Sequence, residues 1–554
     1  MTSSAAPSAP AGEPAVRRWA LEAVGAAVLV AVVHLVCRLS ASFLVGALND
    51  DGVYVVLGKA IAEGEGYRSI HLVGAPVHVR YPPGFPALLA IPWALGGSLG
   101  AVRATVAVMN LLATAGAAGL VWWIGRRRLG AAPWPLAVCA LSTFLLDGTI
   151  QYFNIPLTES YLVLGWAAAL ALAYPLFDSG AAGATGVAPL VRAAVVGLVL
   201  AATTLFRAAG IALLPAVLLA LVLHRRWRAA IACAVAGVGP LAAWAMLRAA
   251  WVARGPVSAV PDDLGYWHWL GVDGPLALAG YAGRTIATNA VEYVPKLASY
   301  LLSSQPIGIG IVALGVIAVA VACLRLWRAH PALIATTLSA SALTLLWPYA
   351  QGRLLLPLLP FLGLLAAAAV SVGIRRLRRR VAWVAAAALG LAALAVTLRQ
   401  VELREAAGRA YWTGTMRLED RSPVLTLALR SRFIHDVVGW VNRHTSPQDR
   451  VMVDAPAAVY LYTGRRTVAG QPTESRLASS VFGVPGRYLA ERILADSVTF
   501  VVLAPPAPAL ERDLLTVSTR CPGVLEAARS ARATYFRVAR DETCLRAILT
   551  GGAR

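Results

Sequence analysis

Residues 49–86 read NDDGVYVVLGKAIAEGEGYRSIHLVGAPVHVRYPPGFP, a polar stretch between two apolar runs. The run before it, residues 19–41, is long enough to cross a membrane. The stretch opens with two adjacent carboxylates, Asp50 and Asp51, and closes at Tyr81-Pro82-Pro83, where the next apolar run begins. Carboxylates at the mouth of a membrane-spanning segment are costly unless they are solvated or have a function. This stretch therefore predicts both a membrane architecture and a candidate site.

The composition is that of a polytopic membrane protein. Of 554 residues, 58% are hydrophobic and 14% are charged, and the mean hydropathy is +0.67, whereas soluble domains are about one quarter charged. A net charge of +21 can indicate nucleic-acid binding. Here, however, much of the excess lies in short tracts between apolar segments, as membrane topology requires. We expect membrane lipid, and no nucleic acid, as a partner.

The apolar segments predict a mainly α fold, a transmembrane bundle of about eleven spans. The predicted spans are 19–41, 101–124, 133–153, 157–177, 190–206, 209–223, 229–252, 306–325, 331–349, 354–373 and 381–399. Residues 84–99 are apolar but short and bounded by proline, and we expect a re-entrant or interfacial helix there.

Arginine tracts at alternate connections predict the orientation. They lie at residues 17–18, 126–128, 225–228, 325–328 and 375–380. Their side is the cytoplasmic one by the positive-inside rule, which places the N-terminus inside and residues 400–554 outside. Most acidic residues of the membrane part then fall on the external face, which indicates outward-facing chemistry. We expect a multi-pass protein of a bacterial cytoplasmic membrane.

Three parts of the chain follow from these patterns. We expect residues 1–16 to form a disordered tail and residues 17–400 to form the membrane domain, with a first external loop at 42–86 and a long external loop at 253–305. Residues 401–554 change to the character of a small α/β domain. We expect helices at 424–443 and 486–495 and strands at 450–454, 497–504 and 533–540.

Two features of the external parts keep alternatives open. In the loop 253–305, Asp262, Asp263 and His268 belong either to a substrate-binding lid or to an aromatic belt at the membrane interface. In the C-terminal domain, Cys521 and Cys544 form either a disulfide or two reduced thiols. No Cys/His metal spacing occurs, and the metal content stays unknown.

The candidate catalytic residues are Asp50, Asp51 and Glu159. A carboxylate at a low-dielectric surface has a raised proton affinity and can act as a general base; the alternative for the Asp50-Asp51 pair is a solvated N-cap. Glu159 in NIPLTES stands at the outer end of a span, where a carboxylate is usually functional. Its alternative is a capping arrangement with Thr158.

The candidate anion-binding residues are Arg80, Arg207 and Arg353, because guanidinium groups suit phosphate. The alternative for each is snorkelling to lipid headgroups. Tyr54, Tyr81 and His78 are candidates for contacting substrate in the first external loop. Carboxylates and arginines on one external face suit a lipid-phosphate leaving group and a hydroxyl acceptor, and no cofactor loop, Walker motif or serine elbow competes.

The chain resembles the GT-C superfamily of membrane glycosyltransferases, particularly bacterial relatives of protein O-mannosyltransferases and lipid A aminoarabinose transferases. The resemblance covers roughly residues 17–400 and rests on four segments. These are NDDGVY with RYPPGFPALLA, NIPLTESYLVL, FRAAGIALLP and GRLLLPLLPFLGLLA.

The resemblance implies transfer of a sugar from a polyprenyl-phosphate carrier to an acceptor outside the cytoplasmic membrane. It also implies that Asp50 matches the catalytic first-loop aspartate and that Glu159 matches the carboxylate of the second motif, where close relatives often have Asp. Arg80 stands where relatives often have a base beside the Pro-Pro pair. We expect an inverting displacement with Asp50 as base, with or without a divalent cation. A transporter or flippase of lipid-linked sugars is the alternative, and a non-catalytic envelope scaffold a further one.

Overall fold

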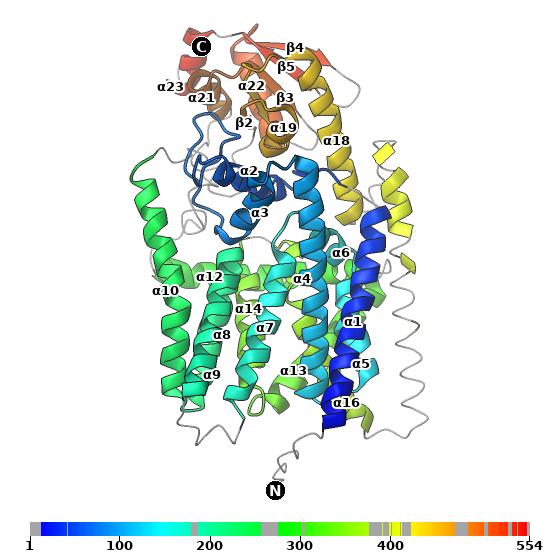
Figure 1. Cartoon of the computed structure of the whole chain (residues 1–554). Helices are drawn as coiled ribbons and strands as arrows, with labels where there is room; N and C mark the ends of the chain where they lie inside the picture. Colours follow the sequence, from blue (N-terminus) through cyan, green and yellow to red (C-terminus); the bar gives the residue numbers. More distant parts are fainter. Residues whose placement is uncertain are drawn as a thin grey trace.

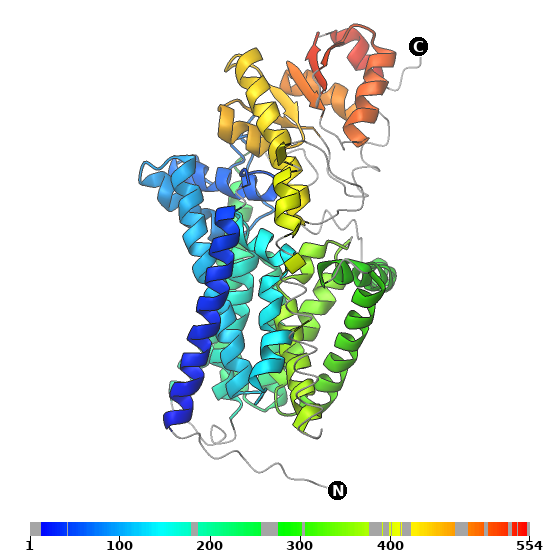
Figure 2. The same cartoon turned by 90° about the vertical axis from the view of Figure 1, so that its right-hand side faces the viewer.

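The computed structural model describes most of the chain. The described residues are 13–40, 43–178, 187–255, 275–301, 305–348, 350–375, 391, 398–399, 402–409, 411–412, 423–470, 486–503, 508–529, 534–539 and 541–550. A helical bundle forms one end of the molecule and a small α/β domain forms the other (Figures 1 and 2). The N-terminus lies at the bundle end opposite the α/β domain (Figure 1).

The bundle is that of a multi-pass membrane protein. In the described residues, six helices are long and apolar enough to cross a membrane, and one bent pair makes up to seven. The six are α1 (Glu13–Ser40), α4 (Leu99–Arg127), α7 (Glu159–Ala173) with η2 (Tyr174–Leu176), α8 (Val187–Phe206), α10 (Trp227–Val252) and α13 (Gln305–Leu326). The bent pair consists of α5 (Pro133–Cys139) with η1 (Leu141–Leu145), followed by α6 (Asp147–Asn154).

Three shorter apolar segments complete the described part of the bundle. They are η4 (Ala208–Ala212) with α9 (Leu213–Leu223), α14 (Pro331–Leu346) and α16 (Leu359–Arg375). Every predicted span up to residue 373 therefore has a helix or a bent pair. The last predicted span, 381–399, lies almost entirely outside the described residues, and the total of eleven stays a prediction.

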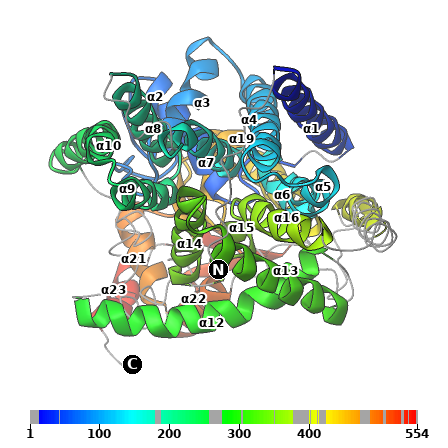
Figure 3. The ribbon, with the colours of Figure 1, turned by 90° about the horizontal axis from the view of Figure 1, so that it is seen from below.

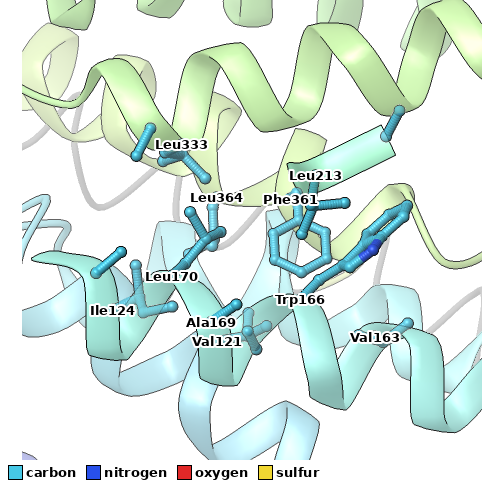
Figure 4. Close-up of a cluster of buried hydrophobic side chains, with 14 of the residues drawn as sticks. Val121, Ile124, Val163, Trp166, Ala169, Leu170, Leu213, Leu333, Phe361 and Leu364 are labelled. Carbon is cyan, nitrogen blue, oxygen red and sulfur yellow. The ribbon is translucent and has the colours of Figure 1, made fainter. Parts of the chain in front are cut away.

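The bundle core is built from large aliphatic and aromatic side chains of five helical segments. Figure 4 shows Val121 of α4, Trp166 of α7, Leu213 of α9, Leu333 of α14 and Phe361 of α16 converging in one buried cluster. The rings of Trp166 and Phe361 lie 5.7 Å apart. Glycine allows closer approach elsewhere: a Cβ added at Gly197 of α8 would lie 2.9 Å from the backbone nitrogen of Gly237 in α10. Such small-residue contacts are the usual means of helix packing in membranes.

The arginine-rich connections among the described residues gather at the end of the bundle where α1 begins (Figure 1). Two acidic residues of the bundle, Glu22 and Asp178, pair with arginines there. The Glu22 carboxylate lies 2.6 Å from Arg126, and the Asp178 carboxylate lies 2.9 Å from Arg128. Both acids therefore compensate local positive charge.

A layer of helices separates the bundle from the α/β domain. It contains α2 (Asp50–Ala62) and α3 (Gly84–Ala94). The short α15 (Gly352–Leu355) stands between α14 and α16 in the chain. With 11 residues, α3 is too short to span a membrane, in agreement with the interfacial helix predicted near residues 84–99.

One helix corrects an expectation from sequence. Residues 275–301, predicted as part of a long external loop, form the 27-residue helix α12 (Pro275–Leu301). This helix lies across the bundle (Figures 1 and 3). Its Asn289 amide donates to the carbonyl oxygens of Leu345 and Trp347, and its Lys296 donates to that of Ala350. The loop reading was wrong there because the polar residues of this segment serve helix-to-helix contacts.

The C-terminal domain is built on a five-stranded mixed sheet in the order β2-β1-β3-β5-β4. The strands are β1 (Val451–Val453), β2 (Thr467–Ala469), β3 (Phe500–Leu503), β4 (Leu525–Arg529) and β5 (Thr534–Val538). β1 pairs in parallel with β2 and β3, and β5 pairs antiparallel with β3 and β4. The domain's helices are α18 (Pro423–His444), α19 (Pro456–Thr463), α21 (Arg487–Asp496), α22 (Pro508–Arg520) and α23 (Glu542–Thr550). A disulfide joins Cys521 to Cys544.

The C-terminal domain holds the first external loop directly. Thr467 of β2 exchanges backbone hydrogen bonds with this loop, donating to the carbonyl of His71 and accepting from the amide of Val73. The backbone of Gly46 packs against Ala458 of α19. The position of α2 therefore depends on the C-terminal domain.

Gly46 provides a test of this contact. Its φ of +95° is a left-handed conformation, and an added Cβ would lie 2.9 Å from the Cα of Ala458. The free energy of unfolding of the Gly46→Ala variant should fall by about 1 kcal/mol because of backbone strain. It should fall further because the new Cβ collides with Ala458. Gly64→Ala is the matched control, because Gly64 has φ +77° and nothing within 4 Å of its added Cβ. Thermal unfolding of both variants in detergent measures the difference; equal losses would contradict the contact.

Candidate active site

Asp50 is the first residue of α2 and is held by two side chains from distant parts of the chain. One carboxylate oxygen lies 2.5 Å from a guanidinium nitrogen of Arg353, on α15. The other accepts a 2.6 Å hydrogen bond from the hydroxyl of Tyr81. The side chains of Asp50 and Arg353 are only 18% and 17% exposed. Asp50 is therefore a paired and largely buried carboxylate, and the N-cap position belongs to Asn49.

The position of Tyr81 is determined by neighbours in the first external loop. The Tyr67 hydroxyl donates to the carbonyl oxygens of Tyr81 and Pro82, at 2.9 and 3.0 Å. The Tyr81 amide donates to Nε2 of His78 at 3.1 Å. The ring of Tyr54, on α2, lies 4.7 Å from the Tyr81 ring. The predicted substrate contacts Tyr54 and His78 thus position Tyr81, and Tyr67 is a positioning residue that sequence analysis missed.

Asp51 has different surroundings from its neighbour. It is fully buried, and its two carboxylate oxygens accept hydrogen bonds from the backbone amides of Gly46 and Leu48, at 2.6 and 3.0 Å. Burial raises the pKa of Asp51 to about 6, with the charge of Asp50 acting in the same direction, although these backbone bonds oppose the shift. Its contacts are those of a residue that shapes the turn before α2.

Glu159 begins α7 and faces a second arginine. Its carboxylate lies 2.9 Å from the guanidinium of Arg207, with the Glu159 side chain fully buried and Arg207 15% exposed. Arg207 also donates to the hydroxyl of Thr158 at 3.1 Å. The Thr158 side chain makes no capping hydrogen bond, so the capping alternative is not realised. The turn before α7 is fixed by the amide of Asn110, which donates to the carbonyl of Ile155.

The two acid–arginine pairs form one electrostatic cluster. The Arg353 guanidinium interacts favourably with the charges of both Asp50 and Glu159. Tyr152 of α6 interacts with Arg353, with Glu159 and with Arg430 of α18. The membrane domain and the C-terminal domain therefore both contribute charge to the site. Tyr152 and Arg430 lie outside the recognised motifs, within α6 and α18, and no sequence signal indicated them.

The charge state of Asp50 corrects an expectation from sequence. Burial favours a higher pKa, but the charges of Arg353 and Arg80 and the Tyr81 hydrogen bond outweigh it and hold the pKa of Asp50 well below its usual range. The premise of a raised proton affinity was wrong for Asp50, because sequence could not show that a guanidinium 303 residues away pairs with it. Asp50 is therefore an ionised carboxylate with little tendency to take up a proton while Arg353 lies beside it.

The remaining predictions concern Arg80, three residues of the long external loop, and a metal site. The Arg80 guanidinium lies over the Tyr81 ring at 5.2 Å and acts on the charge of Asp50. Asp262, Asp263 and His268 lie outside the described residues. Within the described part of the chain, no three His, Cys, Asp or Glu side chains come together as metal ligands.

The whole architecture matches solved membrane proteins. Structural comparison finds ArnT from Cupriavidus metallidurans bound to undecaprenyl phosphate, at 16% identity and TM-score 0.52, covering 95% of this chain and 98% of that one. It also finds the oligosaccharyltransferase AglB from Archaeoglobus fulgidus, in complex with an inhibitory peptide and a dolichol-phosphate. AglB matches at 14% identity and TM-score 0.55, covering 95% of this chain and 74% of that one.

The chain has the GT-C fold. The resemblance predicted from four sequence segments is confirmed at the level of the fold, and the match extends over the C-terminal domain as well. No family model and no curated protein sequence matches the chain. The GT-C fold places the first external loop, with its acidic pair, next to the outer end of α7.

His78 makes the GT-C site sensitive to acid. Burial lowers the pKa of His78 to about 3, and the Arg80 charge acts in the same direction. Between pH 6.5 and 3, His78 is protonated in the unfolded chain but neutral in the folded protein. Its contribution to the free energy of unfolding therefore falls as the pH falls. From pH 7.5 to 5 the His78→Gln variant should lose about 2 kcal/mol less stability than the parent chain.

The control for this prediction is His435→Gln, at an exposed histidine of α18. Its loss of stability between the two pH values should match that of the parent chain. Unfolding of the three proteins in detergent measures the effect. If His78→Gln and the parent chain lose the same stability between these pH values, His78 is not the neutral acceptor of the hydrogen bond from the Tyr81 amide.

Proposed function

We propose that this protein is a membrane glycosyltransferase that moves a sugar from a polyprenyl-phosphate carrier to a hydroxyl acceptor. The single observation that carries the proposal is the pair of acid–arginine contacts, Asp50 with Arg353 and Glu159 with Arg207, at one end of the bundle in a GT-C fold. A carboxylate able to take a proton and a guanidinium able to take a phosphate charge are the two groups that such a transfer requires.

The donor class follows from the relatives in structure. ArnT was solved with undecaprenyl phosphate and AglB with a dolichol-phosphate, both polyprenyl-type lipid phosphates. Arg353 and Arg207 are the groups proposed to bind such a phosphate here, with Arg80 beside them. Binding of the phosphate to Arg353 would compete with Asp50 for the same guanidinium. We propose that donor binding thereby releases the Asp50 carboxylate for its role as a base.

The reaction is proposed as an inverting displacement. Asp50 accepts the proton of the acceptor hydroxyl while the acceptor oxygen forms a bond to the anomeric carbon. The bond from that carbon to the phosphate oxygen breaks on the opposite face of the sugar. The polyprenyl phosphate leaves with the bonding electron pair, and the nearby guanidinium groups stabilise its charge. Glu159 keeps Arg207 in place and positions the sugar.

The location of the site supports an orientation. The arginine-rich connections lie at the end of the bundle opposite the site (Figure 1), and the positive-inside rule assigns that end to the cytoplasm. We propose that the N-terminus is cytoplasmic and that the site and the C-terminal domain lie outside a bacterial cytoplasmic membrane. The transfer would then modify a component of the cell envelope.

A transporter or flippase of lipid-linked sugars is the competing function. It would move the same lipid without breaking the bond between sugar and phosphate. Purified protein incubated with a panel of synthetic polyprenyl-phosphate pentoses and hexoses, together with envelope glycans as acceptors, distinguishes the two. Release of free polyprenyl phosphate, with sugar on the glycans, identifies a transferase; transbilayer movement without release identifies a flippase.

Asp50→Asn keeps the shape of the side chain but removes the proton acceptor. Transfer should fall at least about 100-fold, as is typical for loss of a general base. Glu63→Gln is the matched control, because Glu63 follows the same helix but pairs with Lys59 at the surface; its activity should stay within twofold. Release of polyprenyl phosphate measures both. Full activity of Asp50→Asn would remove the proposed mechanism.

A further inference from the structure

The C-terminal sheet has one face that its helices cover only in part. On one side, β1, β3 and β5 pack through Met452, Val501 and Phe536 in a core with residues of α21, α22 and α23. On the other side α18 packs its Val437 and Val441 against β1 and β3. A helix about 10 Å wide covers about two strands spaced 4.8 Å apart. On the part of this face beside α18, Tyr535 of β5 is buried, whereas Arg537 of β5 and Glu526 of β4 are exposed.

A groove of about 720 Å³ lies at this place. Its lining comes from the end of α18, from the start of β3 and from β4 and β5, and includes Trp440, Phe500, Tyr535 and Arg537. These strands lie at the end of the molecule farthest from the bundle (Figure 1). The groove is thus separate from the candidate active site, which lies below the domain.

The groove contains a column of aromatic rings. The rings of Trp440 and Tyr535 are 4.0 Å apart and within 10° of parallel. The imidazole of His444 lies 5.0 Å from Trp440 at 18°, and the Phe500 ring meets Trp440 edge-on at 5.6 Å. Tyr535 is buried, whereas the His444 side chain is exposed. Rings stacked in this way are rigid, and the exposed His444 ring carries the column to the surface of the groove.

Charged hydrogen-bonding groups flank these rings. Glu526 of β4 stands opposite Arg537 of β5 in the sheet register, and both residues are exposed. Neither forms an ion pair among the described residues. Asp449, also in the lining, receives hydrogen bonds from Ser446 through one of its two oxygens. The groove therefore offers a planar cation that can donate hydrogen bonds and two carboxylates that can still accept them.

The balance of charge indicates what fits. Two carboxylates and one guanidinium make the groove weakly acidic, in a chain whose net charge is +21. A nucleic acid or other polyanion would be repelled at this place. A neutral sugar satisfies both parts of the lining, because its C–H faces pack on aromatic rings and its hydroxyls donate and accept hydrogen bonds. We propose that this groove is a non-catalytic binding site for a neutral oligosaccharide segment.

The binding site does not depend on the proposed transfer reaction. Its residues are distant in the fold from Asp50 and Glu159, and it needs only a saccharide outside the bundle. Should the transferase proposal hold as well, the groove would retain part of an extended glycan while a different part reaches the reaction centre.

The test measures binding to the full-length protein in detergent, with the Asp50→Asn substitution in all samples so that no probe can be turned over. The probes are neutral tetra- to hexasaccharides prepared from mannan, galactan, arabinan and glucan, titrated by calorimetry. The groove variants are Glu526→Gln and Arg537→Ala. The controls are Glu511→Gln and Arg512→Ala, exposed positions on α22, which covers the opposite sheet face.

At least one probe should bind, and each groove variant should weaken that binding about tenfold, as expected for loss of a charged hydrogen-bond partner. The controls should bind as the parent protein does. The proposal is overturned if no probe binds, if groove and control variants bind alike, or if an unrelated aromatic peptide displaces the saccharide and binds more tightly. Because binding is read without turnover, failure of this proposal and failure of the transferase proposal give separate results.

Discussion

The ion pair between Asp50 and Arg353 is the contact on which the account of this site depends. It joins the first helix after the first span to the turn before the last described span, across 303 positions of sequence. In a site this sheltered from water, an unpaired charge would be far more costly than in solution. Both partners are therefore held until another charge replaces one of them. In the function proposed above, an anionic lipid headgroup is the group that provides this replacement charge.

Several contacts keep this ion pair in place without touching any substrate. The Tyr67 hydroxyl and the His78 ring fix the backbone at Tyr81. The Tyr81 hydroxyl in turn donates a hydrogen bond to the Asp50 carboxylate. The C-terminal domain contributes through Thr467, which binds the loop backbone, and through Tyr462, which accepts the amide of Val45. The small α/β domain is thus part of the scaffold of the site. A change in that domain would be transmitted to α2 through these hydrogen bonds.

Sequence was sufficient for those features that depend on local pattern. Apolar runs of adequate length located the bundle helices, and alternation with turn residues located α18, α21 and the strands β1, β3 and β5. It also found Asp50, Glu159, Arg207 and Arg353, because charged residues at span ends are rare. Sequence could not pair them, since Asp50 meets Arg353 and Glu159 meets Arg207 only through the packing of helices. For the same reason it could not separate Asp51, which holds a turn, from Asp50, which faces Arg353, or foresee that residues 275–301 form a helix.

The central claim is that a lipid phosphate takes Arg353 away from Asp50. A cryo-electron microscopy structure of the protein in lipid nanodiscs, with and without undecaprenyl phosphate, tests it most directly. The account predicts that the Arg353 guanidinium contacts the phosphate in the lipid-bound state and that the Asp50 carboxylate is then separated from it and open to the site. A lipid phosphate bound elsewhere, with the contact between Asp50 and Arg353 intact, would contradict the account.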